Sequence, residues 1–505
     1  MRSVSFTIFI GLVILCTGYA QPVLTPRNIA LGGGGSTYIT DYNANFYNPA
    51  NLLIKDRKGT VDFGFLITGS YFIPVQSFSN LDNQRKNFED YLTRYKPGNY
   101  TITGLDKAEI IENNYAKNKL TSPHQSRLES TLFGIHWKKD NKAYSLAFRT
   151  RTSSSFEVGR NWYTDIPVTT EGTVISNQTL KHRYQTLHEV SFGYAESMSF
   201  FNGMSSRIDN FIVGIAPKLV LGGAYQNASW QNVYKQETNS SDIVRSQNFE
   251  YSAAGNFSDA TSEYLNGAPA DQAIRNNINP ISNQAFDIYG VGAGLDIGFT
   301  YLLTLGSDLS TLQPRIQQTR KSLRIAFSIT DIGFVSYKDK GIEYTSEKDT
   351  TITNSFPNSA NDAFVGAPGQ FLQYVDQFGE GNPFQSFTAT SNTFSVLLPT
   401  AIHGGVMLEL NRIKLSGDVS MGLTNNAFNS KKIIASMGAE LRVLKFLPLR
   451  AGMQLASELP GFISFGTAIE TRFWDLSLAT QLSTSSLRSN TVFAGVTVAA
   501  LQFHL

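Results

Sequence analysis

The chain has 505 residues, of which 41% are hydrophobic, 16% charged and 12% aromatic. Its formal net charge is +2 and its basic residues are scattered, which excludes the basic surface that nucleic acid requires. The single cysteine, Cys16, excludes an intrachain disulfide framework and a thiolate metal site. No segment offers 18 consecutive apolar residues, so the sequence predicts no membrane-spanning helix.

The first twenty residues have the pattern of a secretory signal peptide. Arg2 precedes an apolar run over residues 6–16, and small residues stand at Gly18 and Ala20, which predicts cleavage after Ala20. The apolar run is too short to span a bilayer as a helix, for which about 20 residues are needed. Cys16 also raises a lipoprotein interpretation, but Leu15 precedes it where a small residue is expected.

The last hundred residues alternate between apolar and polar positions. Ile413, Leu415 and Val419 point one way, whereas Lys414 and Asp418 point the other. A period of two indicates β-strands, and repetition in units of about ten residues with aromatics on the apolar face is typical of a transmembrane β-barrel. About fourteen such segments occur: 59–73, 127–138, 143–154, 186–197, 208–221, 285–302, 322–336, 396–411, 413–423, 432–443, 446–456, 461–473, 474–484 and 490–505.

The connections between these segments alternate in length. Tight ones occur at 140–142, 201–206, 411–412 and 444–446, and long polar stretches occur at 74–126, 155–185, 222–284 and 337–395. Short periplasmic turns and long extracellular loops are the usual asymmetry of such barrels. The sequence therefore predicts an all-β fold: a transmembrane antiparallel β-barrel of about 14 strands over residues 59–505, with long extracellular loops.

Two loop segments contain helical patterns. Residues 87–119 lack β-branched runs, and residues 369–379 place Phe371, Tyr374 and Val375 on one helical face, together with Phe378. Each helix either caps the barrel and buries its own apolar stripe, or forms a lid or landing site for an apolar ligand or a protein. The stretch 222–284, rich in Asn, Ser, Asp and Ala, is interpreted as a solvated loop.

Residues 21–58 do not have the pattern of a strand and are predicted to form a plug or hatch in the lumen. The candidate hatch residues are the flexible glycines and the turn around the proline: Gly32, Gly33, Gly34, Gly35, Asn48, Pro49 and Ala50. The glycines permit close packing against the wall, and polar lumen residues are expected to pair with the backbone of the segment.

This segment carries a family resemblance. Ala30–Gly33 followed by Phe46–Leu52 (A-L-G-G, then F-Y-N-P-A-N-L) is similar to the N-terminal region of the FadL-like outer-membrane barrels. The superfamily includes the PorV-type and PorQ-type barrels of type IX secretion in Bacteroidota, and the greatest likeness is to a barrel family with only a domain-of-unknown-function label. The resemblance also covers Leu447–Gly452 and Trp474–Leu476, and it implies fourteen strands with an N-terminal plug.

No catalytic pattern is present. The sequence lacks H-E-x-x-H, G-x-S-x-G and the lysine of a phosphate-binding loop, so we expect no enzyme activity, no catalytic residue, no metal and no cofactor. His403 and Glu409 face inward together and would orient a base, but a polar lumen residue is the more ordinary role for such a histidine.

The inward charges of the C-terminal half mix both signs, whereas an ion-selective pore is expected to carry a ring of one sign. Cross-strand pairs that fill the wall or hold a plug are therefore predicted. The predicted polar lumen residues are His403, Glu409, Glu440, Arg442, Arg450, Glu470 and Arg472.

Two functions fit these patterns, both in the cell outer membrane and in contact with its lipid. The first, implied by the resemblance, is passage or binding of an apolar small molecule through a gated lumen. The alternative is a non-conducting protein-interaction barrel of PorV type, which serves type IX secretion or another envelope complex through its outer loops.

Overall fold

The computed structural model describes residues 24–54, 61–73, 111, 115, 121–164, 168–170, 173–198, 209–278, 286–305, 321–338, 340–353, 356, 370–377, 382–456, 461–483 and 498–504. The predicted signal peptide and nearly all of the predicted helical stretch 87–119 lie outside these residues. Within them, no helix combines the length and the hydropathy that crossing a bilayer would require.

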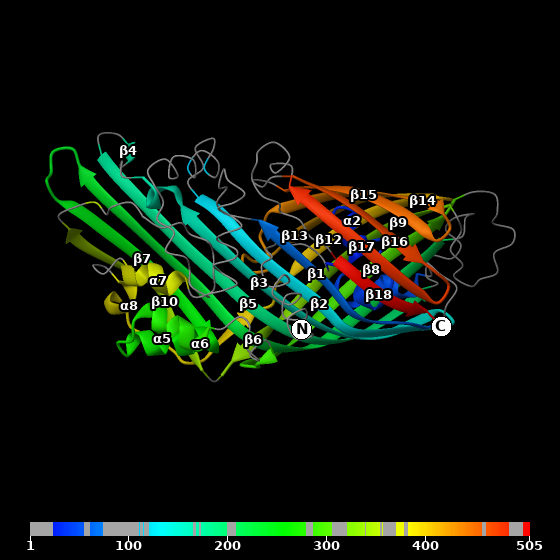
Figure 1. The fold of residues 1–505 in the computed structure, drawn as a ribbon, viewed down its shortest axis with the longest axis horizontal. Helices are drawn as coiled ribbons and strands as arrows, with labels where there is room; N and C mark the ends of the chain where they lie inside the picture. Colours follow the sequence, from blue (N-terminus) through cyan, green and yellow to red (C-terminus); the bar gives the residue numbers. More distant parts are fainter. Residues whose placement is uncertain are drawn as a thin grey trace, which may run out of the picture.

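Fourteen antiparallel strands close into a ring (Figure 1). The described sheet has 18 strands, and four of them (β4, β7, β10 and β11) lie outside the ring. In ring order the fourteen are β1 (Val61–Ile73), β2 (Thr121–Lys139), β3 (Lys142–Gly159), β5 (Thr173–Met198), β6 (Asp209–Glu237), β8 (Gly290–Thr304), β9 (Lys321–Tyr337), β12 (Ala401–Leu410), β13 (Ile413–Gly422), β14 (Ile433–Leu444), β15 (Leu447–Ala456), β16 (Phe462–Glu470), β17 (Trp474–Ser483) and β18 (Val498–His504). Strand β18 pairs with β1 through Phe63↔Phe503 and its neighbours, which closes the barrel and confirms the predicted fold class.

The barrel exposes its apolar face and buries its polar face. Leu415 and Val419 on β13 are 46% and 51% exposed, whereas Lys414 and Asp418, each next to one of them, are 8% and 5% exposed. This is the reverse of a soluble β-protein and is the outward surface that suits lipid. Tight turns at 140–141, 411–412 and 445–446 gather at one end, together with His504, and this end is called the short-turn end.

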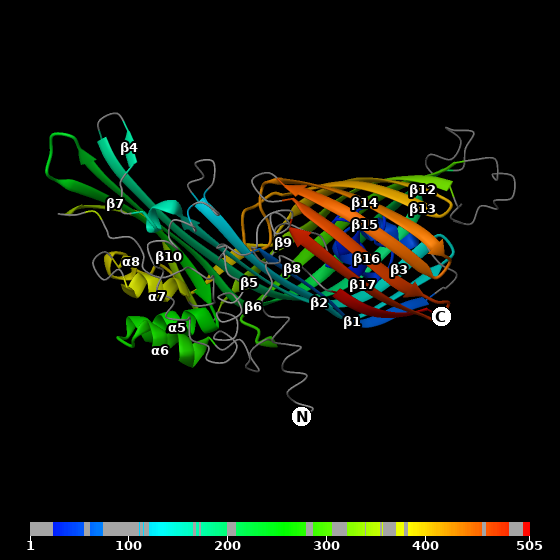
Figure 2. The same ribbon diagram turned by 45° about the horizontal axis from the view of Figure 1, so that its top comes forward.

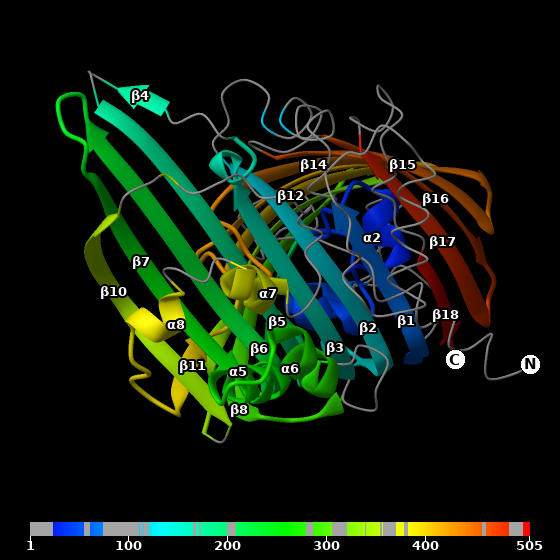
Figure 3. The ribbon, with the colours of Figure 1, turned by 60° about the vertical axis from the view of Figure 1, so that its left-hand side comes forward.

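At the opposite end, strands β5 and β6 continue far beyond the ring (Figures 1 and 3). The extensions pair with β4 (Val168–Thr170), β7 (Ile243–Ala254) and, through β7, β10 (Gly341–Thr353). Four helices lie beside this sheet: α5 (Asn256–Leu265), α6 (Ala270–Asn277), α7 (Gln370–Gln377) and α8 (Pro383–Ser386). The extended sheet and these helices are called the cap. Strand β11 (Phe394–Leu397) pairs with the cap-end half of β9.

The cap has its own aromatic core. Phe249 is fully buried and its ring lies 5.1–6.1 Å from the rings of Tyr251, Tyr344, Phe384 and Phe387. The interpretation of 222–284 as a solvated loop is therefore wrong, because the stretch forms the end of β6, β7, α5 and α6. Its amides stand on both faces of the strands, since Asn232 is buried between Trp230 and Tyr234, and this polar composition obscures the alternation.

The predicted helix at 369–379 is present as α7. Phe371, Tyr374 and Val375 are buried in the core of the cap, so the helix buries its apolar stripe as one of the two interpretations expected. Phe378 lies outside the described residues.

Residues 24–54, called the plug, lie inside the ring (Figure 2). They contain three short helices: α2 (Pro26–Ala30), η1 (Tyr42–Phe46) and η2 (Pro49–Leu53). Each begins at a residue whose side chain accepts a hydrogen bond from the first turn, namely Thr25, Asp41 and Asn48. Proline follows Thr25 and Asn48 at the first helical position, where no amide hydrogen is needed.

Candidate functional site

The glycine run of the plug turns the chain sharply against the wall. Gly32 and Gly33 have φ of 86° and 84°, which is left-handed backbone that favours glycine. A Cβ on Gly32 would lie 2.5 Å from the carbonyl oxygen of Met453 on β15, and Gly35 has φ of 142°. Gly34 packs directly on the carboxylate of Asp418. Gly32, Gly34 and, through its amide, Gly35 therefore lie at the contact between plug and wall, whereas the amide of Gly33 bonds within the plug to Asn28.

Asp418 on β13 is the strongest single anchor of the plug. Its Oδ1 accepts hydrogen bonds from the backbone N–H of Gly35 (3.2 Å), the backbone N–H of Ser36 (2.9 Å) and the hydroxyl of Ser36 (2.5 Å). A carboxylate that accepts several hydrogen bonds in a buried place forms charge-assisted contacts, which are about twice as strong as neutral ones. Sequence reasoning places Asp418 on the inward face but does not select it as a site residue.

The Asn48-Pro49-Ala50 turn fastens the plug to β6 and β8, two further strands of the wall. The side-chain amide of Asn48 donates to the carbonyl oxygen of Ser36 (2.8 Å) and to the hydroxyl of Thr300 on β8 (3.0 Å). Thr300 in turn donates to Asn51 Oδ1 at 2.8 Å. Pro49 and Ala50 lie against Gly214 of β6, at a distance that leaves no room for a Cβ on that glycine.

The wall contributes glycines of its own wherever the plug comes close. At each of these positions a Cβ would collide with the plug or with the Asp418 carboxylate that holds it: Gly64, Gly134, Gly193, Gly214, Gly298, Gly405, Gly438, Gly452 and Gly466. Glycine weakens a strand unless another backbone must approach it closely. Inward glycines in otherwise regular strands are therefore a readable signal for the seat of the plug.

Most of the predicted lumen residues form a chain of buried ion pairs between neighbouring strands. Arg450 on β15 bonds Glu440 on β14 (2.8 Å) and Glu470 on β16 (2.6 Å). Arg442 also contacts both carboxylates, at 3.1 and 2.8 Å, and Arg27 of the plug lies 3.9 Å from Glu440. The plug thus adds a cation to a network of the wall.

Glu409 and His403 both lie on β12 but are not in contact. Glu409 therefore does not orient His403 as a general base, which the sequence had suggested. Glu409 pairs with Arg324 on β9 (3.2 Å) and Lys414 on β13 (3.4 Å), and Arg324 also donates to the carbonyl oxygen of Thr37 in the plug. His403 contacts Thr330 (3.0 Å), and its ring centroid lies 4.2 Å from that of Tyr47.

Arg472 is not a lumen residue. It is exposed in the turn between β16 and β17, with its guanidinium 5.4 Å from the ring centroid of Phe473. The prediction carries the alternation of β16 past Glu470, where the strand ends, and so assigns Arg472 to the wrong environment.

Nearer the cap, eight charged side chains form a buried layer across the lumen, called the ionic layer. Its members come from six strands: Arg127, Glu129, Arg149, Arg151, Glu189, Lys218, Asp296 and Asp331. Each is at most 5% exposed, and the four basic groups balance the four acidic ones. Glu189 contacts Arg149 (2.6 Å), Arg151 (2.9 Å) and Lys218 (3.5 Å), whereas Asp331 contacts Arg151 (2.8 Å) and Lys218 (2.5 Å).

Sequence reasoning missed the ionic layer because it assessed inward charges only in the C-terminal half. The signal is Arg149 and Arg151 at alternate positions of one strand, opposite Glu189 on the next. Asp331 is harder to foresee. It has φ of 58° at the point where β9 changes its partner from β12 to β11, and this bend turns its carboxylate into the layer.

Two aromatic rings cover the ionic layer from opposite sides. Phe46 of the plug lies 3.9 Å from the guanidinium of Arg149, and Phe428 lies 4.8 Å from that of Arg151. Phe428 belongs to residues 423–432, called the Phe428 loop, which connect β13 to β14 and fold inward rather than outward. The hydroxyl of Ser153 donates to the carbonyl oxygen of Ala427 (2.5 Å), and Asn429 donates to the carbonyl oxygens of Pro399 and Thr400.

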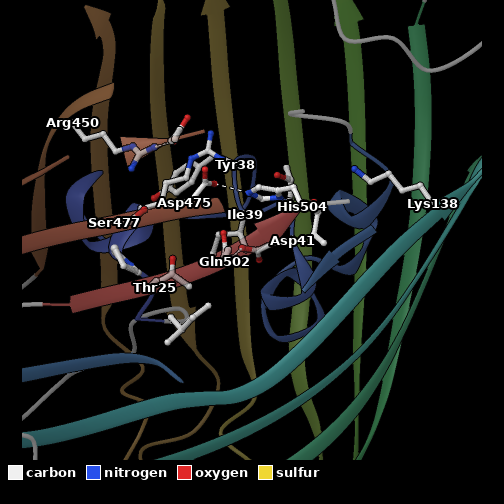
Figure 4. Close-up of a pocket in the computed structure, with 17 residues that line it drawn as sticks. Thr25, Tyr38, Ile39, Asp41, Lys138, Arg450, Asp475, Ser477, Gln502 and His504 are labelled. Atoms are coloured by element: carbon white, nitrogen blue, oxygen red, sulfur yellow. Dashed lines mark hydrogen bonds and ion pairs between the residues drawn. The ribbon is translucent and has the colours of Figure 1, made fainter. Parts of the chain in front are cut away.

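A small polar pocket of about 80 Å³ opens between the plug and the wall near the short-turn end (Figure 4). Thr25, Tyr38 and Asp41 line it from the plug, and Lys138 and His504 line it from the wall. Among the described residues, no group of three or more His, Cys, Asp and Glu is arranged to hold a metal ion. The plug, the ionic layer and the Phe428 loop all lie inside the ring, and together they are called the seal.

The model of one protein family, described as a family of unknown function (DUF5723), matches residues 66–502 of the chain. No curated protein matches the chain. Solved structures similar to it include the Ralstonia pickettii toluene transporter TbuX, with 12% identity, a TM-score of 0.43 and coverage of 96% of this chain and 99% of that one. The Pseudomonas putida toluene transporter TodX has 10% identity, a TM-score of 0.41 and the same coverage. A Pseudomonas aeruginosa FadL homologue has 10% identity, a TM-score of 0.31 and, again, the same coverage.

Proposed function

The chain belongs to the family of unknown function DUF5723, and we propose that it is an outer-membrane barrel that admits an apolar small molecule when its plug moves. The short-turn end then faces the periplasm and the cap faces outward, as is usual for such barrels. The apolar substrate class comes from the resemblance of Ala30–Gly33 and Phe46–Leu52 to the FadL-like barrels.

The observation that carries this proposal is the nature of the seal. The lumen is filled by a separate segment that polar anchors fasten to the wall, such as Asp418 on Ser36 and Thr300 on Asn48. The same segment also packs its apolar side chains against inward wall residues such as Ile212 and Met407. Polar anchors can be exchanged for water at small net cost, because a hydrogen bond in a protein contributes only about 0.5–1.5 kcal/mol net. A lumen filled by the wall's own side chains would have no comparable way to open.

The experiment compares conductance and uptake in proteoliposomes. The variants are the intact barrel, a deletion of residues 21–52, and the same deletion combined with a shortened 424–430 loop, because the Phe428 loop and the ionic layer form a second barrier. We expect the intact protein to be closed, the double variant to conduct ions, and the intact protein to speed entry of a fluorescent apolar probe over protein-free liposomes. A double variant that is closed, or an intact barrel without effect on probe entry, would contradict the proposal.

A second candidate is the non-conducting protein-interaction barrel, and the cap favours it. Simple passage of a small molecule does not require a sheet extension with four helices and a core of its own. Affinity purification of the tagged barrel from solubilised membranes tests it. A stoichiometric partner that is lost when α5–α8 are removed would support this function, and a barrel that elutes alone at every salt concentration would contradict it.

A further inference from the structure

Two histidines and two aspartates form a connected cluster where the barrel closes. His504 of β18 lies between Asp62 of β1 (Nδ1 to Oδ1, 2.7 Å) and Asp475 of β17 (Nε2 to Oδ2, 2.8 Å). Asp62 also contacts His136 of β2 (Oδ2 to Nδ1, 3.2 Å). The four side chains thus connect the strands on both sides of the β1–β18 seam, and Asp62, Asp475 and His504 also line the pocket in Figure 4.

The cluster reaches the plug directly. The other ring nitrogen of His136, Nε2, lies 2.8 Å from the backbone carbonyl oxygen of Leu52, and Lys138 donates to that of Ile54 at 2.7 Å. On the opposite side, Gln502 of β18 donates to Asp41 of the plug at 2.6 Å. The end of η2 is therefore held by side chains of β2, and the start of η1 by a side chain of β18.

The chemistry of the partners decides the protonation of both rings. A carboxylate and a backbone carbonyl can only accept hydrogen bonds, whereas a neutral imidazole has one nitrogen that donates and one that accepts. His504 faces two carboxylates, and His136 faces a carboxylate and a carbonyl. Each ring makes both of its contacts as hydrogen bonds only when both nitrogens carry a proton, that is, as an imidazolium.

The charges around the cluster are compatible with two imidazolium ions. Asp62 and Asp475 supply two negative charges within it. The other charged groups that line the adjoining pocket are Asp41, Glu470, Arg27, Lys138 and Arg450. Arg450 and Glu470 are paired with each other at 2.6 Å, so they contribute no net charge. Arg27 and Lys138 exceed Asp41 by one positive charge, and Arg27 lies 3.9 Å from the carboxylate of Glu440.

We propose that His136, His504, Asp62 and Asp475 form a proton-dependent latch that holds the plug at the seam of the barrel. When the histidines are protonated, all four contacts are charge-assisted hydrogen bonds, three to carboxylates and one to a carbonyl oxygen. When a ring loses its proton, one of its nitrogens points a lone pair at an acceptor and that bond is lost. The latch is therefore strongest at acid pH and loosens as pH rises, with Lys138 remaining as a pH-independent anchor.

The latch rests on the proposed function only in requiring a plug that can move, and it does not depend on the substrate. Its test is hydrogen–deuterium exchange of the full-length barrel in detergent. The reporters are the amides of Asn51 and Ile54, which are bonded within η2. Rates are divided by the intrinsic rate at each pH, which gives a protection factor at about pH 5 and about pH 8.5, on either side of the range in which histidine titrates.

In the intact protein we expect protection of these amides to fall about tenfold or more between the two pH values, since about 1.4 kcal/mol of lost bonding changes an equilibrium tenfold. At both pH values, His136→Gln should show the lower protection that the intact protein shows at about pH 8.5. His188→Gln, a change on β5 outside the cluster, is the matched control and should behave as the intact protein does.

The decisive variant is D62N/D475N. The side-chain amide that D62N introduces can donate to the lone pair of a neutral His136, and the amide that D475N introduces can do the same for a neutral His504. Both rings keep their other donated bond. The double variant should therefore retain high protection at about pH 8.5, where the intact protein has lost it. A merely structural role of the aspartates predicts a loss instead.

Protection that does not change with pH in the intact protein, or a D62N/D475N variant as pH-sensitive as the intact one, would overturn the latch. Neither result bears on probe entry into proteoliposomes, so the latch and the proposed function fail separately.

Discussion

The plug and the cap both lie outside the fourteen-stranded wall, and they are held in different ways. The plug contacts the wall through carboxylates, amides and backbone brought close by glycine, as at Asp418 and Gly214, and also through an apolar cluster that includes Met407. The cap is held by an aromatic core around Phe249 and Tyr251. Polar anchors can exchange with water, whereas opening an aromatic core exposes large apolar area. The difference supports the proposal of a plug that moves more readily than the cap unfolds.

The largest expected effect concerns the cap. Phe249→Ala removes a fully buried ring that contacts four others, and we expect it to destabilise the cap by about 4 kcal/mol. Val244→Ala on the same strand, at a 37% exposed position, should have little effect. Limited proteolysis of the cap in denaturant measures the difference. If the two variants resisted protease equally, the aromatic core would not be what holds the cap, and the distinction from the plug would be lost.

The ionic layer tests the polar side of the comparison. Arg151→Met leaves Glu189 and Asp331 short of a buried partner, and we expect a loss of about 3 kcal/mol in urea unfolding of the barrel. The half-exposed pair between Lys181 and Glu157 is the control, and Lys181→Met should cost less than about 1 kcal/mol. If Arg151→Met unfolded like the control, the layer would not be part of the seal.

Two glycines with left-handed backbone allow the cost of backbone strain to be measured separately from the cost of a close contact. Gly32→Ala combines a φ of 86° with a collision against Met453, whereas Gly267 has a φ of 96° and open space around its missing Cβ. We expect Gly32→Ala to weaken plug protection in hydrogen exchange by about 2 kcal/mol and Gly267→Ala to destabilise the cap by about 1 kcal/mol. Equal losses of stability in the two variants would mean that the plug does not pack closely against the wall at Gly32.

The smallest effect is an alkaline one in the cap. Burial raises the pKa of Tyr251 to about 12, above the ordinary value for tyrosine of about 10. The unfolded cap therefore loses this proton first, and stability falls as pH rises above about 10, by about 1 kcal/mol at pH 11. Tyr251→Phe should flatten this dependence when cap unfolding is followed by near-ultraviolet circular dichroism. An unchanged slope would assign the alkaline loss to other groups.

The barrel itself was predictable from the sequence because each strand carries its own alternation, as Leu415 and Val419 show against Lys414 and Asp418. The cross-strand pairs of Arg450 with Glu440 and Glu470 also followed from alternation, since neighbouring strands bring their inward residues together. The prediction for Arg472 was wrong because alternation alone does not mark the end of a strand.

Other features depend on contacts that no local pattern encodes. The Asp418 anchor joins residues 382 positions apart in sequence, and the inward fold of the Phe428 loop depends on Ser153 and Asn429. The cap has the composition of a solvated loop, and amides such as Asn232 share the buried face with Trp230 and Tyr234, which obscures the alternation. Signals for some of these features exist, in inward glycines and paired Arg–Glu positions, but they require knowledge of which strands are neighbours.

The position of His504 has a consequence for assembly. Its strand, β18, is the one that closes the ring onto β1, and Asp62 of β1 is the residue shared by both histidines of the cluster. A chain in which these two strands have not yet met lacks the contact between Asp62 and His504. The cluster, and with it the joint hold on η2 from β2 and on η1 from β18, would therefore be complete only once the ring has closed.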